Sequence, residues 1–162
     1  MSNPNLSWRE GHMAVVFKDE TFADLKRSME DVFGAGARAV MYFLGRICGQ
    51  RTYFKLSLLY QGKGLFQACI ELKEQEGWGT FQCEINGDGV GTVWVEDCFE
   101  ARGYGPSSEP VCHFVRGYIE GFLSSAFRKE LWVTETSCIA RGDRECVFEV
   151  RPAPGTAGTT LK

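Results

Sequence analysis

Residues 112–146 read CHFVRGYIEGFLSSAFRKELWVTETSCIARGDREC, and this stretch decides the predicted fold. It holds three cysteines and one glutamate whose spacing makes sense only when they are taken together: Cys112, Glu135, Cys138 and Cys146. Thiolates and carboxylates are both ligands of tetrahedral Zn²⁺. The four side chains are therefore candidate ligands of one zinc ion, with every coordination position filled and none open for water.

A β-hairpin brings two of these candidate ligands together. Residues 131–140 and 145–150 are rich in strand-forming residues, and a short run of turn residues separates them. If the loop centres on Gly142, Cys138 lies directly across from Cys146, with Cβ atoms roughly 5 Å apart on one face of the sheet. Two thiolates in that arrangement can share one metal ion.

Glu135 and Cys112 each need a further structural feature to reach the same point. Glu135 lies three residues before Cys138 and would face the other way on a regular strand, so we expect a bulge or break near Thr136 or Ser137. Residues 107–130 predict a helix with Ser107 or Ser108 as N-cap and Pro110 in its first turn. Cys112 then lies near the helix N-terminus, where the helix dipole favours a thiolate.

Other interpretations of the same cysteines stay open at this point. Buried cysteine is often only a small hydrophobic residue. Cys138 and Cys146 could also form a disulfide or simply pack across the hairpin. Spacing alone does not select zinc, because glutamate is an uncommon zinc ligand and no C-x-x-C pair is present.

A family resemblance adds weight to the zinc interpretation. The run C-x22-E-x2-C-x7-C, followed by FEVRP, with G-Y-x3-G on the helix and C-x3-GD-x2-C in the hairpin, resembles the four-vinyl-reductase domain family. The similarity is strong over residues 94–152. That family includes the effector-sensing domains of phenol-responsive bacterial transcription activators, in which the matching residues bind a structural zinc ion. The resemblance therefore implies the same role for the cysteines and glutamate here.

The order of elements predicts an α+β fold in which helices pack on an antiparallel sheet. The resemblance implies the same fold, which TRAPP subunits and nitric-oxide-sensing domains share and which is commonly dimeric. The expected strands are 13–17, 78–85 and 90–101 together with the hairpin, and the expected helices before the hairpin are 21–33, 37–48, 53–60 and 63–75.

The expected helix over 37–48 is apolar on most sides and carries Gly45 and Gly49 four residues apart. Small residues at that spacing allow another helix to approach closely. The partner is a helix of the same chain or, in a homodimer, a second copy of it. We expect a homodimer with these helices near the interface.

Composition limits the class of protein. With 162 residues and 44% hydrophobic residues, the chain predicts one domain over 1–152 and a flexible tail over 153–162. It has no apolar run of ~18 residues and no signal-peptide core, which predicts a cytoplasmic protein without a membrane span. Seven cysteines fit a reducing compartment. The net charge of −3 argues against a nucleic-acid partner.

The resemblance also implies a ligand pocket between the long helix and the sheet. Trp94 matches a tryptophan that lines the effector pocket of the phenol sensors, and Tyr118 and Val133 are candidate wall residues. Arg116 is a candidate partner for an acidic ligand, although Glu120, four residues on, offers it an ion pair at the surface. Those sensors hold the phenol hydroxyl with an earlier histidine that this chain lacks, so we do not expect phenol.

Three classes of function remain. The first is a non-catalytic sensor or carrier domain for a small apolar or aromatic molecule, with structural zinc and an unknown downstream protein partner. The second is a reductase or accessory protein of porphyrin or bacteriochlorophyll metabolism. No nicotinamide or flavin fingerprint supports a reductase. The third is an interaction module like the TRAPP subunits. The balance favours the first class.

Overall fold

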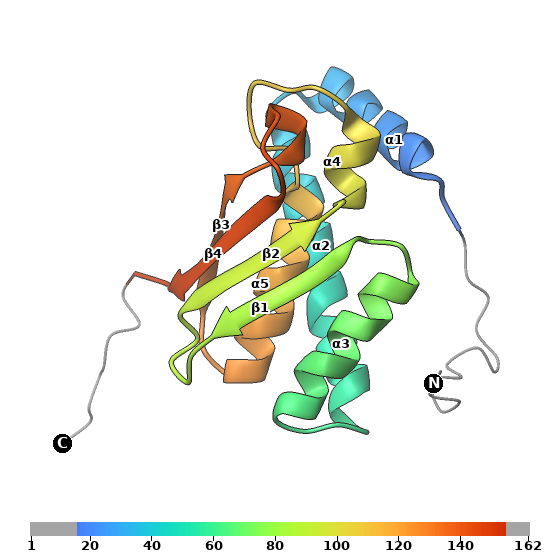
Figure 1. Ribbon diagram of the computed structural model, residues 1–162. Coiled ribbons are helices and arrows are strands. Elements are labelled where there is room, and N and C mark those ends of the chain that lie inside the picture. The colour runs from blue at the N-terminus through green and yellow to red at the C-terminus, as the bar shows by residue number, and fades with distance from the viewer. Residues whose placement is uncertain (1–15, 155–162) are drawn as a thin grey trace.

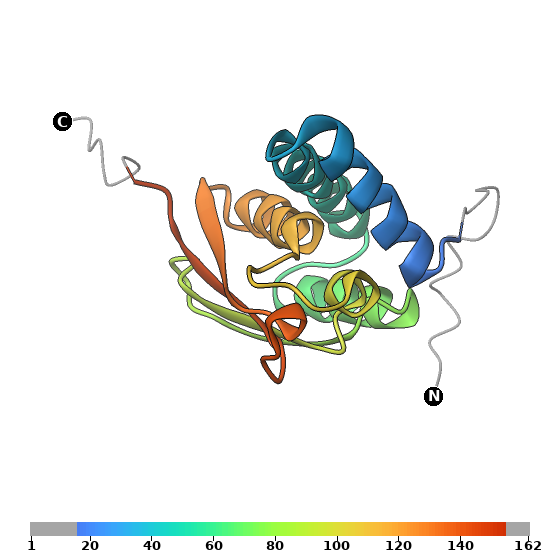
Figure 2. The ribbon, with the colours of Figure 1, turned by 90° about the horizontal axis from the view of Figure 1, so that it is seen from above.

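The structure is a computed structural model that describes residues 16–154. In those residues a four-stranded antiparallel sheet is covered on one face by helices, as the sequence predicts. Figure 2 shows helix α5 between the sheet and the helix α2, with α1 outermost. The elements are α1 (Asp19–Phe33), α2 (Gly36–Ser57), α3 (Lys63–Gln75), β1 (Thr80–Ile85), β2 (Gly91–Glu96), α4 (Phe99–Tyr104), α5 (His113–Phe127), β3 (Leu131–Ser137), the 3₁₀ turn η1 (Ile139–Arg141) and β4 (Cys146–Pro152).

The strands lie in the order β1-β2-β4-β3, so β4 returns to the centre beside β2. Each strand alternates between a face buried under the helices and a face without a covering element in the described residues. Val93, Val133 and Phe148 point inward and are at most 5% exposed, whereas Trp132 on the outer face is 57% exposed. One face of the sheet therefore supplies the core.

The β3–β4 pair contains the irregularity that the sequence predicts. Glu135 pairs with Phe148, but the next pair is Ser137 with Val147, so Thr136 is the extra residue of a bulge. The prediction of a bulge near Thr136 is confirmed. Beyond it the register is the one expected for a loop centred on Gly142, and it ends one pair before Cys138 and Cys146.

Helix α5 packs against α2 through glycines on both helices. A Cβ atom at Gly45 or Gly49 would overlap the carbonyl oxygen of Phe114 or Tyr118 in α5, and Gly117 and Gly121 of α5 meet the backbone of α2 in the same way (see Figure 1 for the two helices). The close approach that Gly45 and Gly49 allow is thus within the chain. The expectation that they serve a dimer contact is wrong.

Several element boundaries differ from the prediction. Helix α5 begins at His113 rather than after Ser107 or Ser108, because Pro110 disfavours helical geometry in the residue before it. The expected strand over 90–101 ends at Glu96, and its last residues start the short helix α4.

Helix α2 continues to Ser57, so most of 53–60 is helical as expected. Of the expected strand 13–17, residues 13–15 lie outside the described residues, and Val16 and Phe17 are not in a strand. In the described residues, no helix is long and apolar enough to cross a membrane.

Candidate functional site

The four predicted metal ligands meet where three elements end. Cys112 is the N-cap residue of α5, Glu135 lies just before the bulge of β3, Cys138 precedes η1, and Cys146 starts β4. Their ligand atoms all lie within 4.8 Å of one another. The extra residue of the bulge turns Glu135 to the same side as Cys138, so an irregular strand is what assembles the cluster.

The sulfur atoms are spaced as metal ligands can be. Cys112 Sγ lies 3.6 Å from Cys146 Sγ and 4.0 Å from Cys138 Sγ. For comparison, tetrahedral coordination with Zn–S bonds of about 2.3 Å places sulfurs about 3.8 Å apart. All three cysteines are fully buried, and the structure contains them as free thiols. The cluster can therefore accept a tetrahedral metal ion with little rearrangement.

Glu135 has one oxygen engaged and one free. Its Oε2 accepts a hydrogen bond of 2.9 Å from the backbone N–H of Cys112, whereas its Oε1 is buried without a hydrogen-bond partner. Burial, and then the charge of Cys138, raise the pKa of the Glu135 carboxyl to about 8. Burial also raises the pKa of the Cys112 thiol well above its ordinary value. A cation bound among these groups would favour their charged forms and give Oε1 a partner.

A second carboxylate, which the sequence patterns did not indicate, anchors the start of α5. Glu100 of α4 is fully buried and accepts hydrogen bonds from the N–H groups of Phe114 and Val115, at 3.2 and 2.9 Å. Lys26 of α1 is equally buried, donates to Glu100 at 2.8 Å, and also donates to the carbonyl of Val111. This buried ion pair ties α1 and α4 to the segment that carries Cys112.

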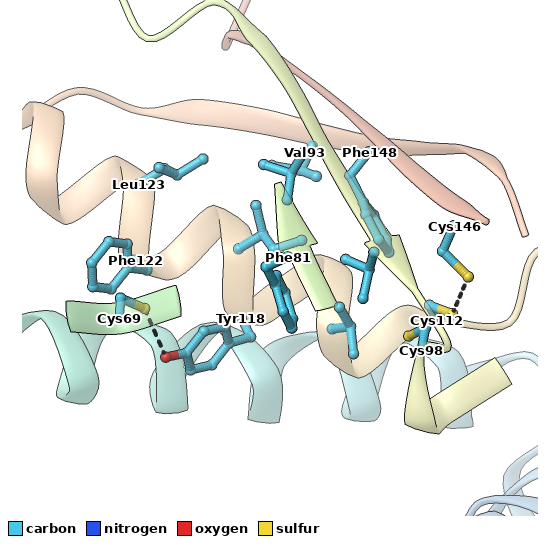
Figure 3. Close-up of a cluster of buried hydrophobic side chains, with 14 of the residues drawn as sticks. Cys69, Phe81, Val93, Cys98, Cys112, Tyr118, Phe122, Leu123, Cys146 and Phe148 are labelled. Atoms are coloured by element: carbon cyan, nitrogen blue, oxygen red, sulfur yellow. Dashed lines mark hydrogen bonds between the residues drawn. The ribbon is translucent and has the colours of Figure 1, made fainter. Parts of the chain in front are cut away.

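Cys98 is the other residue that the sequence patterns did not indicate. It is the N-cap residue of α4, is fully buried, and places its Sγ 3.7 Å from that of Cys112 (Figure 3). Its separation of fourteen residues from Cys112 crosses a helix and a loop, so no regular spacing indicates the contact. Only the helix-like composition of 99–104 could have shown that the strand ends before it.

An apolar cavity of about 50 Å³ lies further along α5, between α3, α5 and strands β1 and β2. Tyr118, Phe122, Phe66 and Phe81 are among its lining residues. The hydroxyl of Tyr118 lies 3.4 Å from the Cys69 sulfur at its wall, as Figure 3 shows. The cavity is thus apolar with one hydrogen-bonding end.

The amine of Lys73 lies beside this polar end. It is 4.3 Å from the centre of the Trp78 ring and 5.0 Å from that of Tyr118, and it forms an ion pair with Glu76. Cation–π contacts of this kind hold a buried amine against aromatic faces. Burial, and then the neighbouring Cys69, raise the pKa of the Tyr118 hydroxyl well above its ordinary value, so it is a neutral donor.

The four residues predicted to bind a ligand do not converge. Tyr118 lines the apolar cavity, but Trp94 does not. Its chain neighbours Val93 and Val95 are buried under the helices, so Trp94 points to the opposite face, between Gln82 and Val147 in the register. The expectation that Trp94 lines a pocket between helix and sheet is not met by this geometry.

Arg116 and Val133 line a separate, more open hollow of about 260 Å³ beside β3. Arg116 lies over the ring of Tyr42, 4.8 Å from its centre, and does not pair with Glu120 as the alternative interpretation expected. Glu120 instead accepts hydrogen bonds from Tyr42 and from the N–H of Val133. The predicted ligand residues are thus divided between two places.

Comparisons with known families identify the segment that carries the cluster. Residues 92–152 match the vinyl-4-reductase domain. The match confirms the resemblance to the four-vinyl-reductase family. Two uncharacterized proteins of Methanocaldococcus jannaschii are similar in sequence: one is 35% identical over 59 residues, covering 36% of this chain and 37% of that protein. The other is 24% identical over 118 residues, covering 73% and 66%. The chain therefore matches less than two thirds of either relative.

Solved structures with the same fold include the phenol-responsive sensory domain of the transcription activator PoxR with phenol, at a TM-score of 0.77 and 22% identity, covering 91% of this chain and 84% of that one. A vinyl-4-reductase family protein from Methanocaldococcus jannaschii has a TM-score of 0.56 and 18% identity, covering 88% and 99%. A trafficking protein particle complex subunit 3 from Naegleria fowleri, covalently bound to palmitic acid, has a TM-score of 0.57 and 14% identity, covering 83% and 95%. These likenesses show the fold.

Proposed function

We propose that this chain is a ligand-binding domain, a sensor or carrier, that takes a small and largely apolar molecule into the cavity beside Tyr118. The observation that carries the proposal is an apolar cavity with a single hydrogen-bonding end, formed by the Tyr118 hydroxyl and the Cys69 sulfur. Sites for small molecules commonly combine apolar walls with a few placed polar groups. The PoxR domain, which has the same fold, is described as phenol-responsive and was solved with phenol.

The size of the cavity limits the ligand. Its volume of about 50 Å³ is roughly a third of the ~150 Å³ cavity that binds benzene in an engineered protein. A ring-sized ligand therefore requires an aromatic wall residue such as Phe66 to move outward. Phenol itself is disfavoured, because the histidine in the described residues, His113, lies at the start of α5 and does not line the cavity.

Zinc is the metal that best fits the cluster at the other end of the site. Three sulfurs and one carboxylate oxygen are a complete tetrahedral donor set for Zn²⁺, with no position left for a reacting water. The buried Glu135 Oε1 without a partner supports a bound cation. The proposed role is structural: the ion joins the start of α5 to the β3–β4 hairpin.

A homodimer is part of the proposal, with an interface different from the one the glycines suggested. On the side of α2 away from α5, apolar side chains 46–66% exposed follow the helical period: Val40, Phe43, Leu44, Ile47 and Phe54. Such a stripe is larger than isolated surface residues require and fits a second copy of α2 across a two-fold axis. Sedimentation should give twice the 18.1 kDa mass of the chain.

Fluorescence titration tests the ligand proposal. Trp78 reports on the cavity, because its ring lies 4.9 Å from that of Tyr118. In a Trp94→Phe, Trp132→Phe background, whose altered residues lie on the outer face, small aromatics should change the Trp78 emission with a dissociation constant below about 1 mM, equivalent to about 4 kcal/mol.

A wall variant serves as the matched control. Phe81→Trp fills the cavity from its β1 wall and should abolish the response. Small aromatics, fatty acids and porphyrins all failing to bind below about 1 mM would refute the proposal. For the metal, elemental analysis of the purified protein should give one zinc per chain, and less than half an equivalent would contradict it.

A further inference from the structure

The candidate metal centre contains one buried thiol more than four-coordinate zinc needs. Cys98 Sγ lies 3.7 Å from Cys112 Sγ, and Figure 3 shows the two side chains meeting beside Cys146. The four ligand atoms that lie within 4.8 Å of one another belong to Cys112, Glu135, Cys138 and Cys146. Cys98 therefore touches the cluster from outside, on the side of Cys112.

The charge of the centre gives this position a meaning. Three thiolates and one carboxylate carry four negative charges, and a divalent cation compensates two of them. The remaining charge is buried, which is costly unless donors reach the ligand atoms. The residues around the cluster must therefore supply hydrogen bonds to it.

Two of the ligands have such a donor from the backbone. The N–H of Ile139 donates to Cys146 Sγ at 3.4 Å, and the N–H of Cys112 donates to Glu135 Oε2 at 2.9 Å. In the described part of the chain, no N–H or O–H group lies within hydrogen-bond distance of Cys112 Sγ. The group at that distance outside the ligand set is the thiol of Cys98.

We propose that Cys98 stays outside the coordination shell as a thiol and donates an S–H···S hydrogen bond to the metal-bound thiolate of Cys112. It acts as a positioning residue, because the hydrogen bond disperses the charge on the sulfur and holds it toward the metal. Since Cys98 is the N-cap residue of α4, the contact also links α4 to the centre. This inference rests on the metal centre proposed above.

Metal affinity and metal spectroscopy of Cys98 variants test it. Competition with a chromophoric chelator should show zinc affinity lowered by about tenfold to a hundredfold in Cys98→Ala. Cys98→Ser should stay close to the unmodified protein, because its O–H can donate in place of the S–H. Cys48→Ala, at a partly buried cysteine of α2 outside the cluster, is the control and should be unchanged.

The Co²⁺-loaded proteins supply a signature that a purely structural role would not move. Loss of the hydrogen bond should shift the sulfur-to-cobalt charge-transfer band to lower energy in Cys98→Ala, with its intensity still that of three sulfur ligands. Should Cys98→Ala not fold, Cys98→Val removes the donor while keeping the space filled.

Either of two results overturns the inference: affinity and band position in Cys98→Ala equal to those of the unmodified protein, or the loss of one sulfur ligand in both variants, which would make Cys98 a ligand itself. The unmodified protein failing to bind one metal ion is a different outcome, since it refutes the proposed centre rather than the role of Cys98 within it.

Discussion

The two parts of α5 are stabilised by different kinds of interaction. Its first turn is fixed by polar groups: Glu135 and Glu100 accept its free N–H groups, Lys26 neutralises Glu100, and Cys112 belongs to the sulfur cluster. Its middle is fixed by shape, because Gly117 and Gly121 let the backbone of α2 approach closely. The first turn thus depends on ionisation and on a bound ion, whereas the middle depends only on fit.

This difference separates stability from ligand binding. The cavity beside Tyr118 lies in the part of α5 that shape controls, and the candidate metal centre lies in the part that charge controls. A ligand that moves wall residues need not disturb the metal centre. Changes at the two ends should therefore differ in their dependence on metal and pH.

The largest effect is expected at the metal centre. Cys146→Ala removes one of four ligands, so the metal no longer contributes to folding. If free metal is about 1,000 times its dissociation constant, the lost stabilisation is about 4 kcal/mol. Urea unfolding with and without a chelator measures it.

The chelator should weaken the unmodified protein and leave Cys146→Ala unchanged. Cys48→Ala, outside the cluster, should respond to the chelator as the unmodified protein does. Equal sensitivity of Cys146→Ala to the chelator would contradict a metal site at this residue.

The buried ion pair gives the next effect. Glu100→Gln leaves the charge of Lys26 unpaired in a fully buried position, which should cost about 3 to 5 kcal/mol. Glu109→Gln is the matched control, because Glu109 pairs with Arg38 at the surface and such pairs contribute about 0 to 1 kcal/mol. Similar losses in the two variants would show that the pair at the start of α5 is not special.

The middle of α5 should respond to volume alone. Gly121→Ala places a methyl group against the carbonyl oxygen of Arg46 and should cost about 1 to 3 kcal/mol, with or without metal. Gly64→Ala, in α3, meets nothing within 4 Å and should be neutral or stabilising. A chelator-dependent effect of Gly121→Ala would remove the distinction between the two parts of the helix.

The smallest effect concerns pH. Burial first, and then the charges of Lys26, Arg116 and Arg38, lower the pKa of His113 to about 3. The unfolded chain, with a histidine pKa near 6.5, binds the proton more readily, so the contribution of His113 is present above about pH 6.5 and is lost as the pH falls toward 3. Thermal unfolding of His113→Gln should therefore fall less steeply from pH 6.5 to 4. Identical slopes for both proteins would refute this.

Sequence patterns predicted the hairpin better than the elements around it. The turn at Gly142 and the odd spacing between Glu135 and Cys138 were enough to predict the register and the bulge. The start of α5 was expected at Ser107 or Ser108 because serine is a good N-cap residue. The true start uses Glu100 and Glu135 as caps, which come from distant segments.

The sequence by itself determined which side chains can form the cluster, because the spacing of Glu135, Cys138 and Cys146 within one hairpin is a local property. The tertiary structure decided what surrounds them. Strand β2 is apolar on both faces, so only the position of α5 determines that Val93 faces the cavity and Trp94 faces away. The contact of Cys98 with Cys112 likewise depends on how α4 packs beside α5, a long-range arrangement that no local spacing encodes.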